Sequence, residues 1–389
     1  MAQNLILVIT TLMIFILLFF ILFLLHKGRR VYANIFLSLY LISQIIGILH
    51  SSLFHMKSIL LPEYIHLFFT GYPAIFLWGV FYYFFIYALL EPDFKLRIRH
   101  VLHLIPFIIV LAYFTANFYL SGTERKLELL RQDSPLYQAL NIFNQCFSFQ
   151  IFSYNVAAVI QYLRYRKRIK NFISTKPEND FWIKTALFGF LAACFISYIG
   201  KVAVGIEINT EQIDSQAIRY GIANIAFLIL YCVLFYLAIS NPGVIMQPEK
   251  REKYWYSKLD SREAKKILAQ LEEYMVRKKP YQKPGLTIKE LASETHINER
   301  YLSQVINEVK KQNFFDFINA FRVEHAKQLL ARNRESRRTM LDILWDSGFN
   351  SKTAFNTVFK KFTGTTPSAF QEKTNLRNAQ TGSAFRIPD

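Results

Sequence analysis

Long apolar runs alternate with short polar segments over the first 240 residues of the chain, and this pattern stops after Met246. A helix of about 20 apolar residues is long enough to cross the hydrocarbon core of a bilayer, which is about 30 Å thick. Seven runs reach that length, at residues 4–25, 31–53, 67–90, 101–120, 137–163, 182–205 and 217–239. The pattern therefore predicts a seven-helix transmembrane domain over residues 1–240, followed by a domain of different chemistry.

The basic residues between these runs indicate an orientation. Twelve follow the first, third and fifth runs: Lys27, Arg29, Arg30, Lys95, Arg97, Arg99, Arg164, Arg166, Lys167, Arg168, Lys170 and Lys176. Four follow the second and fourth runs: Lys57, Arg125, Lys126 and Arg131. Because Lys and Arg are enriched in short cytoplasmic loops, we expect the N-terminus outside the membrane and the C-terminal domain in the cytoplasm.

Helical periodicity with frequent charges replaces the apolar runs in the last third of the chain. Residues 241–259 are predicted to be a linker, since Asn241-Pro242-Gly243 ends the seventh helix. Asp260 and Glu263 have the spacing of a capping box, which predicts a helix through about Arg277. The apolar positions of this helix recur at helical spacing, at Ile267, Leu268, Leu271 and Met275.

A helix-turn-helix pattern comes next. Thr287 and Glu290 have capping-box spacing and predict a short helix, His296-Ile297-Asn298 predicts a turn, and a second helix follows. The apolar face of that second helix consists of Leu302, Val305, Ile306 and Val309. A short helix, a tight turn and a helix with a polar outer face are typical of DNA-reading units.

The same pattern recurs about 52 residues later, after a predicted linking helix from about Phe314 to Ala331. In this alignment Leu291 pairs with Ile343, and Ile297 pairs with Phe349. One extra residue in the second turn then brings Leu302 onto Phe355 and Val305 onto Val358. Ser351 is predicted to cap the second reading helix, with an inner face of Phe355, Val358, Phe359 and Phe362. Two aligned copies favour a DNA-binding module far more than one copy would.

On these motifs, residues 262–372 resemble the DNA-binding domain of the AraC/XylS-type transcriptional regulators. The second repeat carries the signature Ile343, Gly348-Phe349-Asn350-Ser351, Phe355, Phe359-Lys360-Lys361, Gly364 and Pro367-Ser368. The first repeat contributes Leu291-Ala292, Tyr301-Leu302-Ser303, Phe314, Arg322, Ala326 and Leu329-Leu330. Two residues depart from the family pattern, His296 in place of the usual glycine and Leu344 in place of the usual alanine. The resemblance implies a double helix-turn-helix domain over residues 260–375, and residues 376–389 are expected to be a disordered tail.

The resemblance also implies which side chains meet DNA. Base edges are expected to contact Arg300, Ser303 and Gln304 in the first reading helix and Lys352, Thr353, Asn356 and Thr357 in the second. Arg can read guanine and Gln adenine in a bidentate way, whereas Ser and Thr discriminate less. Phosphates are expected to contact Asn298, Ser351, Lys360 and Lys361. Arg322 has two interpretations, a structural ion pair or a DNA contact.

Charge and composition agree with this division. The 389-residue chain has a formal net charge of +18, of which residues 1–248 carry +8 and residues 249–389 carry +10. The excess in the tail suits nucleic acid. Cys146, Cys194 and Cys232 lie in separate apolar runs, so we expect buried apolar residues rather than a disulfide or a metal site. We predict no metal and no cofactor, and the sequence carries no enzyme signature.

The apolar part contains a few polar residues that could bind a signal. Asn144, Ser148 and Asn155 lie near helical spacing in the fifth run, and Lys201 and Arg219 lie near the outer ends of the last two runs. The alternatives are hydrogen bonds between helices for the first three residues and snorkelling to the membrane interface for the last two.

Taken together, the sequence predicts an all-α, multi-pass protein of the bacterial inner membrane that acts as a one-component transcription regulator. Its expected partners are double-stranded DNA, the lipid bilayer and an unknown small-molecule or membrane-derived signal, and a homodimer is left open. The linker is expected to couple the two parts, with proteolytic release of the tail as the alternative. The competing function is a membrane transporter or enzyme with a regulatory helical tail.

Overall fold

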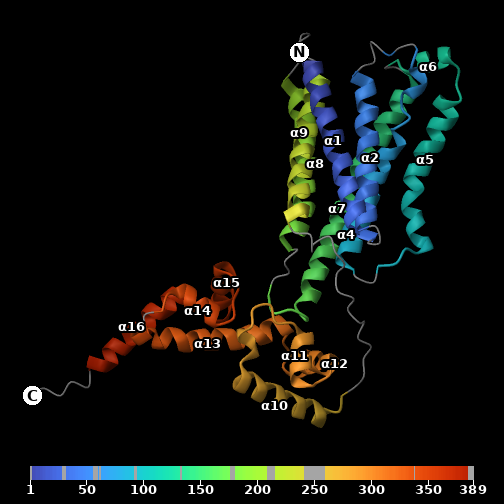
Figure 1. The fold of residues 1–389 in the computed structure, drawn as a ribbon. Helices are drawn as coiled ribbons and strands as arrows, with labels where there is room; N and C mark the ends of the chain where they lie inside the picture. Colours follow the sequence, from blue (N-terminus) through green and yellow to red (C-terminus); the bar gives the residue numbers. More distant parts are fainter. Residues whose placement is uncertain are drawn as a thin grey trace, which may run out of the picture. The chain divides into compact units, whose positions relative to one another are not determined.

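The computed structural model describes a chain that is helical almost throughout. Its described residues are 2–28, 32–55, 60, 63–91, 94–131, 134–175, 180–207, 215–240, 259–336 and 338–383. Within them, the one pairing of extended backbone is an antiparallel bridge between Ile173 and Thr287, so the all-α prediction is confirmed there. The chain divides into two compact units (Figure 1): a first unit of Met1–Leu163 with Glu178–Arg251, and a second unit of Arg164–Pro177 with Glu252–Asp389.

The first unit consists of long helices and short helical turns. Its elements are α1 (Ala2–Gly28), α2 (Tyr32–His55), η1 (Ile65–Leu67), η2 (Pro73–Leu77), α4 (Trp78–Leu90), η3 (Ile98–Leu104), α5 (Ile105–Phe114), η4 (Thr115–Tyr119), α6 (Thr123–Leu129), α7 (Pro135–Ile169, its last turns in the second unit), α8 (Asp180–Glu207) and α9 (Ser215–Ser240). In Figure 1, α1 lies beside α2 and α9, and α8 lies beside α9. The hydroxyls of Tyr40 and Tyr231 join α2 to α9 through a buried hydrogen bond of 3.0 Å.

Six stretches of the described residues are helical, long and apolar enough to cross a membrane. They are Leu7–His26, Tyr32–Phe54, Pro73–Leu90, Ile98–Tyr119, Asp180–Ile199 and Gly221–Ser240. These stretches correspond to six of the seven predicted spans. The third stretch begins at Pro73 and not at residue 67 as predicted, because turns and a short 3₁₀ segment occupy residues 63–72.

The fifth predicted span, residues 137–163, is helical but is not among those six stretches. It lies in the 35-residue helix α7, whose apolar character is interrupted by Gln138, Asn141, Asn144, Gln145, Ser148, Gln150, Ser153 and Asn155. One exposed stripe of α7 is nevertheless mostly apolar: it consists of Ile142, Phe149, Phe152, Val156, Ile160 and Leu163, with the exposed polar residue Gln145 between the first two. The described residues therefore contain six stretches suited to spanning a membrane, and the seventh span stays a prediction.

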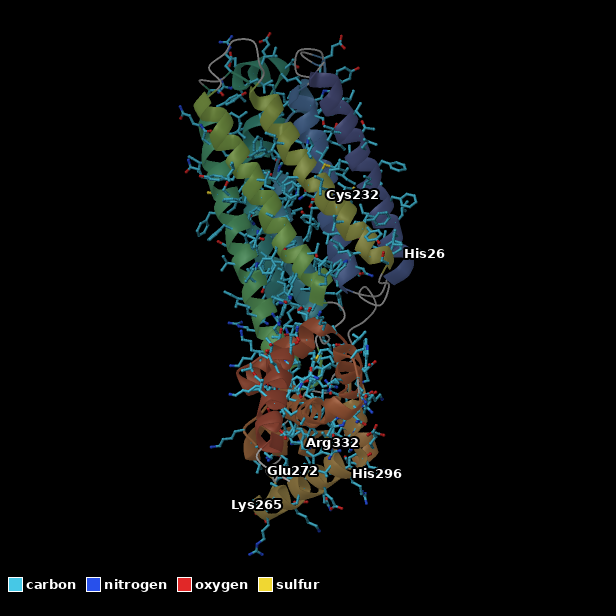
Figure 2. All side chains as sticks on the ribbon, turned by 90° about the vertical axis from the view of Figure 1, so that its left-hand side faces the viewer. His26, Cys232, Lys265, Glu272, His296 and Arg332 are labelled. Atoms are coloured by element: carbon cyan, nitrogen blue, oxygen red, sulfur yellow. The ribbon has the colours of Figure 1, made fainter. Side chains whose placement is uncertain are left out.

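The three cysteines do not lie where their apolar neighbours suggested. All three are free thiols, but Cys146 and Cys232 are exposed and Cys194 is half-buried; Cys232 is labelled on α9 in Figure 2. The prediction that all three are buried is therefore wrong. The reason is that the helices of the first unit are apolar on their outer faces as well, for example at Phe149 and Tyr236, so an apolar neighbourhood in sequence does not place a residue inside.

The second unit contains the C-terminal helices together with residues 164–177. Its elements are α10 (Ser261–Lys278), η6 (Pro280–Gln282), α11 (Ile288–Thr295), α12 (Glu299–Gln304), η7 (Val305–Val309), α13 (Phe314–Ser336), α14 (Met340–Asp346), α15 (Lys352–Thr363) and α16 (Pro367–Ser383). Helix α10 begins where predicted, although Asp260 forms no side-chain cap hydrogen bond, so the capping box expected there is wrong. Helix α16 continues to Ser383, which corrects the expectation of a disordered tail for residues 376–383. Residues 384–389 and the linker residues 241–258 lie outside the described residues.

Helix α13 joins two hydrophobic cores. Its first half, at Phe314, Phe317 and Ile318, packs with the buried residues of α10, α11 and α12. Its second half packs with α14 and α15, in a core formed by Val323, Ala326, Leu330, Ile343, Leu344, Phe349, Phe355, Val358 and Phe359. The predicted core positions are therefore buried or half-buried, except Val309 and Phe362, which are 39% and 38% exposed. One helix thus supports both helix-turn-helix subdomains.

Candidate DNA-binding surface

The first helix-turn-helix subdomain consists of α11, a turn and α12. The hydroxyl of Thr287 accepts a hydrogen bond from the backbone N–H of Glu290, and the Glu290 carboxylate accepts one from the backbone N–H of Thr287, so the predicted capping box is confirmed. The turn contains His296 with a left-handed φ of 55°. Asn298 then caps α12 by accepting a hydrogen bond from the N–H of Arg300. Beyond Gln304 the reading helix continues as a π-helical turn, η7, which the sequence did not predict.

The second subdomain repeats these devices in register. Thr339 and Asp342 form the same reciprocal capping box, 52 residues after Thr287 and Glu290. This box was not predicted, although its Thr-x-x-Asp spacing is a sufficient signal. Gly348 occupies the left-handed position of the turn with a φ of 84°. Ser351 then caps α15 through the N–H of Ala354, which places the extra residue in the turn, as the alignment predicted.

We expect His296→Gly to stabilise the second unit by about 0.5–1 kcal/mol. A left-handed conformation costs a residue with a Cβ about 1–2 kcal/mol, and glycine avoids this cost. Glycine also makes the unfolded chain more flexible, which opposes folding and offsets part of the stabilisation. Hydrogen exchange of the α11 and α12 amides in the full chain measures the change. Ser293→Gly, in the interior of α11, is the matched control and should destabilise by about 0.5 kcal/mol. A destabilising effect of His296→Gly would contradict the expected strain.

The predicted base-reading residues of the first subdomain share one helix. Arg300, Ser303 and Gln304 all lie on α12 and are half-buried. The amide of Gln304 donates a hydrogen bond to Glu308 (2.9 Å), and the side chain of Asn307 donates to the backbone oxygen of Ser303 (2.8 Å). Gln304 must therefore exchange its contact with Glu308 for a base if it is to read DNA.

The predicted base-reading residues of the second subdomain are more accessible. Lys352, Thr353 and Thr357 are exposed on α15, and Asn356 is half-buried beside them. Thr353 and Thr357 lie on the face of α15 that points away from the buried residues Phe355 and Phe359, whereas Lys352 and Asn356 lie three residues before those phenylalanines, at the edge of the buried face.

The predicted phosphate contacts differ in how free their polar groups are. The side-chain oxygens of Asn298 and Ser351 already serve as helix caps, which leaves backbone N–H groups at the two helix starts as the anion-binding groups. Lys361 forms an ion pair with Asp316 (2.6 Å) and lies over the ring of Phe362. Lys360 is exposed and has no ion pair within the described part of the chain.

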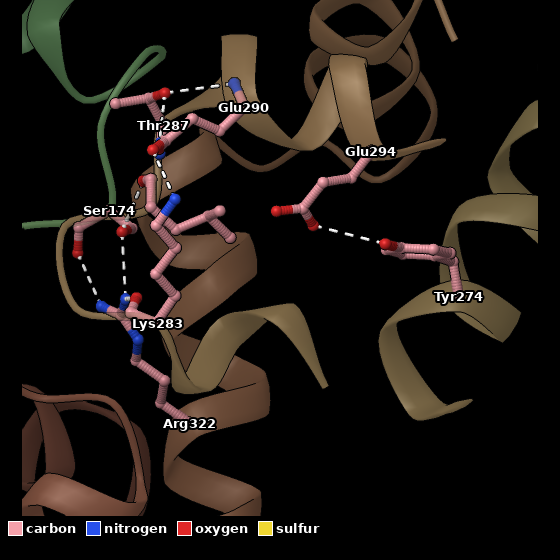
Figure 3. A network of polar contacts seen from close by, with 8 residues as sticks. Ser174, Tyr274, Lys283, Thr287, Glu290, Glu294 and Arg322 are labelled. Carbon is pink, nitrogen blue, oxygen red and sulfur yellow. Dashed lines mark hydrogen bonds and ion pairs between the residues drawn. The ribbon is translucent and has the colours of Figure 1, made fainter. Parts of the chain in front are cut away.

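Arg322 is a structural residue rather than a DNA contact, and its partners are not carboxylates. Its side chain is fully buried in α13. The guanidinium donates five hydrogen bonds: to the backbone oxygens of Tyr281 (2.8 Å), Ser174 (3.1 Å) and Lys283 (3.0 Å), to the Ser174 hydroxyl (3.1 Å) and to Asn319 Oδ1 (3.3 Å). Figure 3 shows Ser174 in front of the guanidinium. Burial lowers the pKa of Arg322 to about 10, so the group stays charged at neutral pH.

The predicted signal-binding residues of the first unit are only partly brought together. Asn144 and Ser148 are exposed on α7; Asn144 accepts a hydrogen bond from the Tyr72 hydroxyl, and the Ser148 hydroxyl donates to the backbone oxygen of Asn144. Asn155 is buried and donates to the backbone of Ile151. The side chains of Lys201 and Arg219 lie outside the described residues.

The first unit also contains a second group of polar side chains, which was not predicted from the sequence. Asn34, Ser38 and Gln44 of α2 and Asn224 of α9 are buried, and each has a polar atom without a hydrogen-bond partner among the described residues. Buried polar groups are usually satisfied, and inside a membrane they mark functional positions more often than elsewhere. Their signal in the sequence was a polar residue within an apolar run. No group of His, Cys, Asp and Glu suited to a metal occurs in the described part of the chain.

These features define a class of protein: residues 291–373 match the family of helix-turn-helix domains, and they form a domain of the AraC type. The melibiose operon regulatory protein of Escherichia coli (strain K12) is 27% identical over 93 residues, which are 24% of this chain and 30% of that protein. An uncharacterized HTH-type transcriptional regulator of Staphylococcus aureus (strain COL) is 35% identical over 86 residues, which are 22% of this chain and 11% of that protein. No solved structure matches the chain significantly.

The family match lies within the DNA-binding part, and the first unit lies outside its residues 291–373. The chain spans less than a third of the length of each of the two relatives. By name, one relative is an operon regulatory protein and the other a transcriptional regulator, which favours a DNA-binding role over an enzymatic one for the C-terminal domain.

Proposed function

We propose that this chain is a membrane-embedded, one-component transcription regulator that binds specific double-stranded DNA through its two helix-turn-helix subdomains. The observation that carries the proposal is the repeated geometry of the second unit. Each subdomain has a capping box, a left-handed turn residue and a capped reading helix, and the second set follows the first by 52 or 53 residues. The two sets pack against the two halves of α13. Such a pair can enter two successive major grooves on one face of DNA, which are about 34 Å apart.

The side chains on the reading helices give this geometry a sequence preference. Arg300 and Gln304 are suited to guanine and adenine edges, and Asn356 to adenine. Lys352 and Lys360 add positive charge beside them, in a part of the chain that carries +10 in total over residues 249–389. Phosphate contacts of this kind supply affinity and position, whereas base contacts supply specificity.

A membrane location for the first unit is favoured by its six apolar stretches and by its apolar outer faces. Large apolar surfaces of this kind are stable in lipid and unfavourable in water. The exposed apolar stripe on α7 extends from Ile142 to Leu163, a rise of about 32 Å at 1.5 Å per residue, which is close to the thickness of a bilayer core. We therefore propose that α7 is the seventh span.

A seventh span also makes the charge distribution consistent. With α7 in the membrane, the basic loops after α1, α4 and α7 all fall on the side that bears the DNA-binding domain. Without it, the loops after α1 and α4 would lie on the opposite side from residues 164–177. The proposed location is the bacterial inner membrane, with the N-terminus outside and the DNA-binding domain in the cytoplasm.

The signal is proposed to act on polar side chains of the first unit. The candidates are Asn144, Ser148, Asn155, Lys201 and Arg219 from the sequence, and the unsatisfied groups of Asn34, Ser38, Gln44 and Asn224 from the structure. A homodimer on repeated DNA sites stays part of the proposal. The competing function, a transporter or enzyme with a regulatory tail, predicts flux or turnover by the chain without its DNA-binding domain.

The DNA-binding proposal is tested with the full chain in lipid nanodiscs and a random duplex library. We expect selection of a preferred sequence at about 150 mM salt, and Arg300→Ala should lower the preference at one position by about 1–3 kcal/mol. Lys360→Ala should weaken binding to all duplexes alike and reduce the salt slope by about 0.9. Lys361→Ala, whose charge Asp316 already offsets, is the matched control with a smaller change in slope. Binding without preference over random DNA would contradict the proposed function.

A further inference from the structure

The segment between α7 and α8 belongs to the DNA-binding unit, although it interrupts the first unit in sequence. Residues Arg164–Pro177 group with the second unit rather than with the helices on either side. Within this segment we call residues 169–175 the docking loop. Phe172 packs against the core of the first helix-turn-helix subdomain. The loop is therefore integrated into the fold of that subdomain and is more than a connection between two helices.

Backbone hydrogen bonds hold the docking loop in one register. The N–H of Ile288 donates to the oxygen of Phe172 (3.0 Å), and the N–H of Ser174 donates to the oxygen of Leu286 (3.2 Å). These two bonds flank the bridge between Ile173 and Thr287. A third bond joins the N–H of Phe315, at the start of α13, to the oxygen of Lys170 (2.8 Å). The loop thus satisfies backbone groups at the starts of both α11 and α13.

Ser174 is the centre of this contact. Its side chain is buried, its hydroxyl donates to the oxygen of Leu286 (2.7 Å), and its backbone oxygen accepts from Asn319 (3.2 Å) and Arg322. Two of the five hydrogen bonds of the Arg322 guanidinium therefore end on Ser174, as Figure 3 shows. A buried charge that loses hydrogen bonds is costly, so the domain depends on the loop to keep Arg322 satisfied.

Arg322 also touches the second subdomain. Its guanidinium lies 5.8 Å from the ring centre of Phe349, in the turn between α14 and α15. The next residue back, Gly348, lies so close to Tyr281 that an added Cβ would be 2.2 Å from the Tyr281 oxygen, and that oxygen is itself a partner of Arg322. The docking loop, η6 and the second turn therefore meet at one guanidinium.

We propose that the docking loop is the element through which the membrane part controls the DNA-binding domain. The occupant of the docking surface is residues 169–175 of the same chain, and its contact partners are Leu286, Ile288, Phe315 and Arg322. The docked loop fixes the Arg322 junction and so fixes the two reading helices relative to each other. This inference rests on the proposed function. Besides the linker, the docking loop is then a second connection through which the membrane part can affect DNA binding, because a structural change in α7 alters the contact of Ser174 with Arg322.

Docking is tested by a disulfide across the bridge. Ile173 and Thr287 form the non-hydrogen-bonded type of antiparallel pair, whose Cα atoms are about 4.5 Å apart and within reach of a disulfide. Ile173→Cys and Thr287→Cys are combined in a full chain with Cys146, Cys194 and Cys232 changed to Ala and with a protease site inserted in the linker. After oxidation in native membranes and linker cleavage, we expect a denaturing gel to show the DNA-binding domain still joined to the membrane part, and to show a separate domain after reduction. Each single cysteine is the control. A separate domain on that gel after oxidation of the double variant overturns docking.

Control of DNA binding is tested on the duplex selected by the wild-type chain. Ser174→Pro removes the N–H to Leu286 and both side-chain contacts of Ser174, so we expect at least about tenfold weaker binding to that duplex, with binding to random DNA changed less than about twofold. The affinity of Ser174→Ala for the selected duplex should lie between those of Ser174→Pro and the wild type. Thr175→Ala is the matched control, and we expect it to leave the affinity unchanged. Unchanged binding by Ser174→Pro overturns the control role.

The failures of the two proposals are distinguishable. If the wild-type chain shows no sequence preference, the proposed function fails whether or not the disulfide forms. If the wild-type chain selects a duplex but the disulfide does not form, docking alone fails. If Ser174→Pro loses random DNA as well, the domain has unfolded. The oxidised chain that carries Ile173→Cys and Thr287→Cys then decides, because locked docking must retain, after the linker is cut, the affinity of the Thr287→Cys single variant. Loss of that affinity overturns the inference.

Discussion

Arg322→Met is expected to destabilise the second unit by about 3–5 kcal/mol, because several buried oxygens lose their donor at about 1–3 kcal/mol each. Methionine fills a similar volume but donates no hydrogen bond, so the oxygens of Ser174, Tyr281 and Lys283 lose a partner in a buried site. The measurement is the free energy of opening of the α13 amides by hydrogen exchange in the full chain. The exchange of the docking-loop amides should rise in parallel, because Ser174 loses the guanidinium that holds it.

The matched control for this change is Arg332→Met on the same helix. Arg332 is exposed and is labelled on the second unit in Figure 2. A surface substitution of this type usually changes stability by less than about 0.5 kcal/mol. Similar effects of the two substitutions would show that the network around Arg322 contributes little.

Gly348→Ala is the second substitution with a large expected effect, about 3 kcal/mol of destabilisation and loss of selective DNA binding. The φ of 84° costs an alanine about 1–2 kcal/mol. The added Cβ would also lie 2.2 Å from the Tyr281 oxygen and 2.8 Å from Cα of Gln282, and relieving an overpacked contact of this kind costs about 1–3 kcal/mol. Because these contacts are backbone atoms of η6, the second turn must move away from the first subdomain.

Gly364→Ala separates the cost of the left-handed backbone from the cost of the close contact. Gly364 has a similar φ of 77° but an added Cβ there meets nothing within 4 Å. Its substitution should cost only the conformational term of about 1–2 kcal/mol and leave selective DNA binding intact. Thermal unfolding and binding to the selected duplex, measured on the full chain, give both numbers. Equal losses for the two glycines would contradict the close approach at Gly348.

The sequence by itself determined the features that depend on neighbours in the chain. Capping at Thr287, Asn298 and Ser351 requires only a side chain and a backbone N–H two or three residues away. Helical periodicity placed Leu302 and Phe355 at equivalent buried positions for the same reason. The departure at His296 likewise marked the position where the family has glycine, and a positive φ is found there.

The tertiary structure alone decided which faces of the helices are inside and which distant residues meet. Hydropathy could not separate the inner from the outer face of α9, because both faces are apolar, and so Cys232 was wrongly expected to be buried. No local pattern connects Ser174 to Arg322, 148 residues later, since a buried guanidinium needs oxygens that only the packed chain brings together. The same holds for Gly348 beside Tyr281. Spacing in a sequence encodes interactions within a helix or turn, whereas contacts between elements depend on how these elements pack.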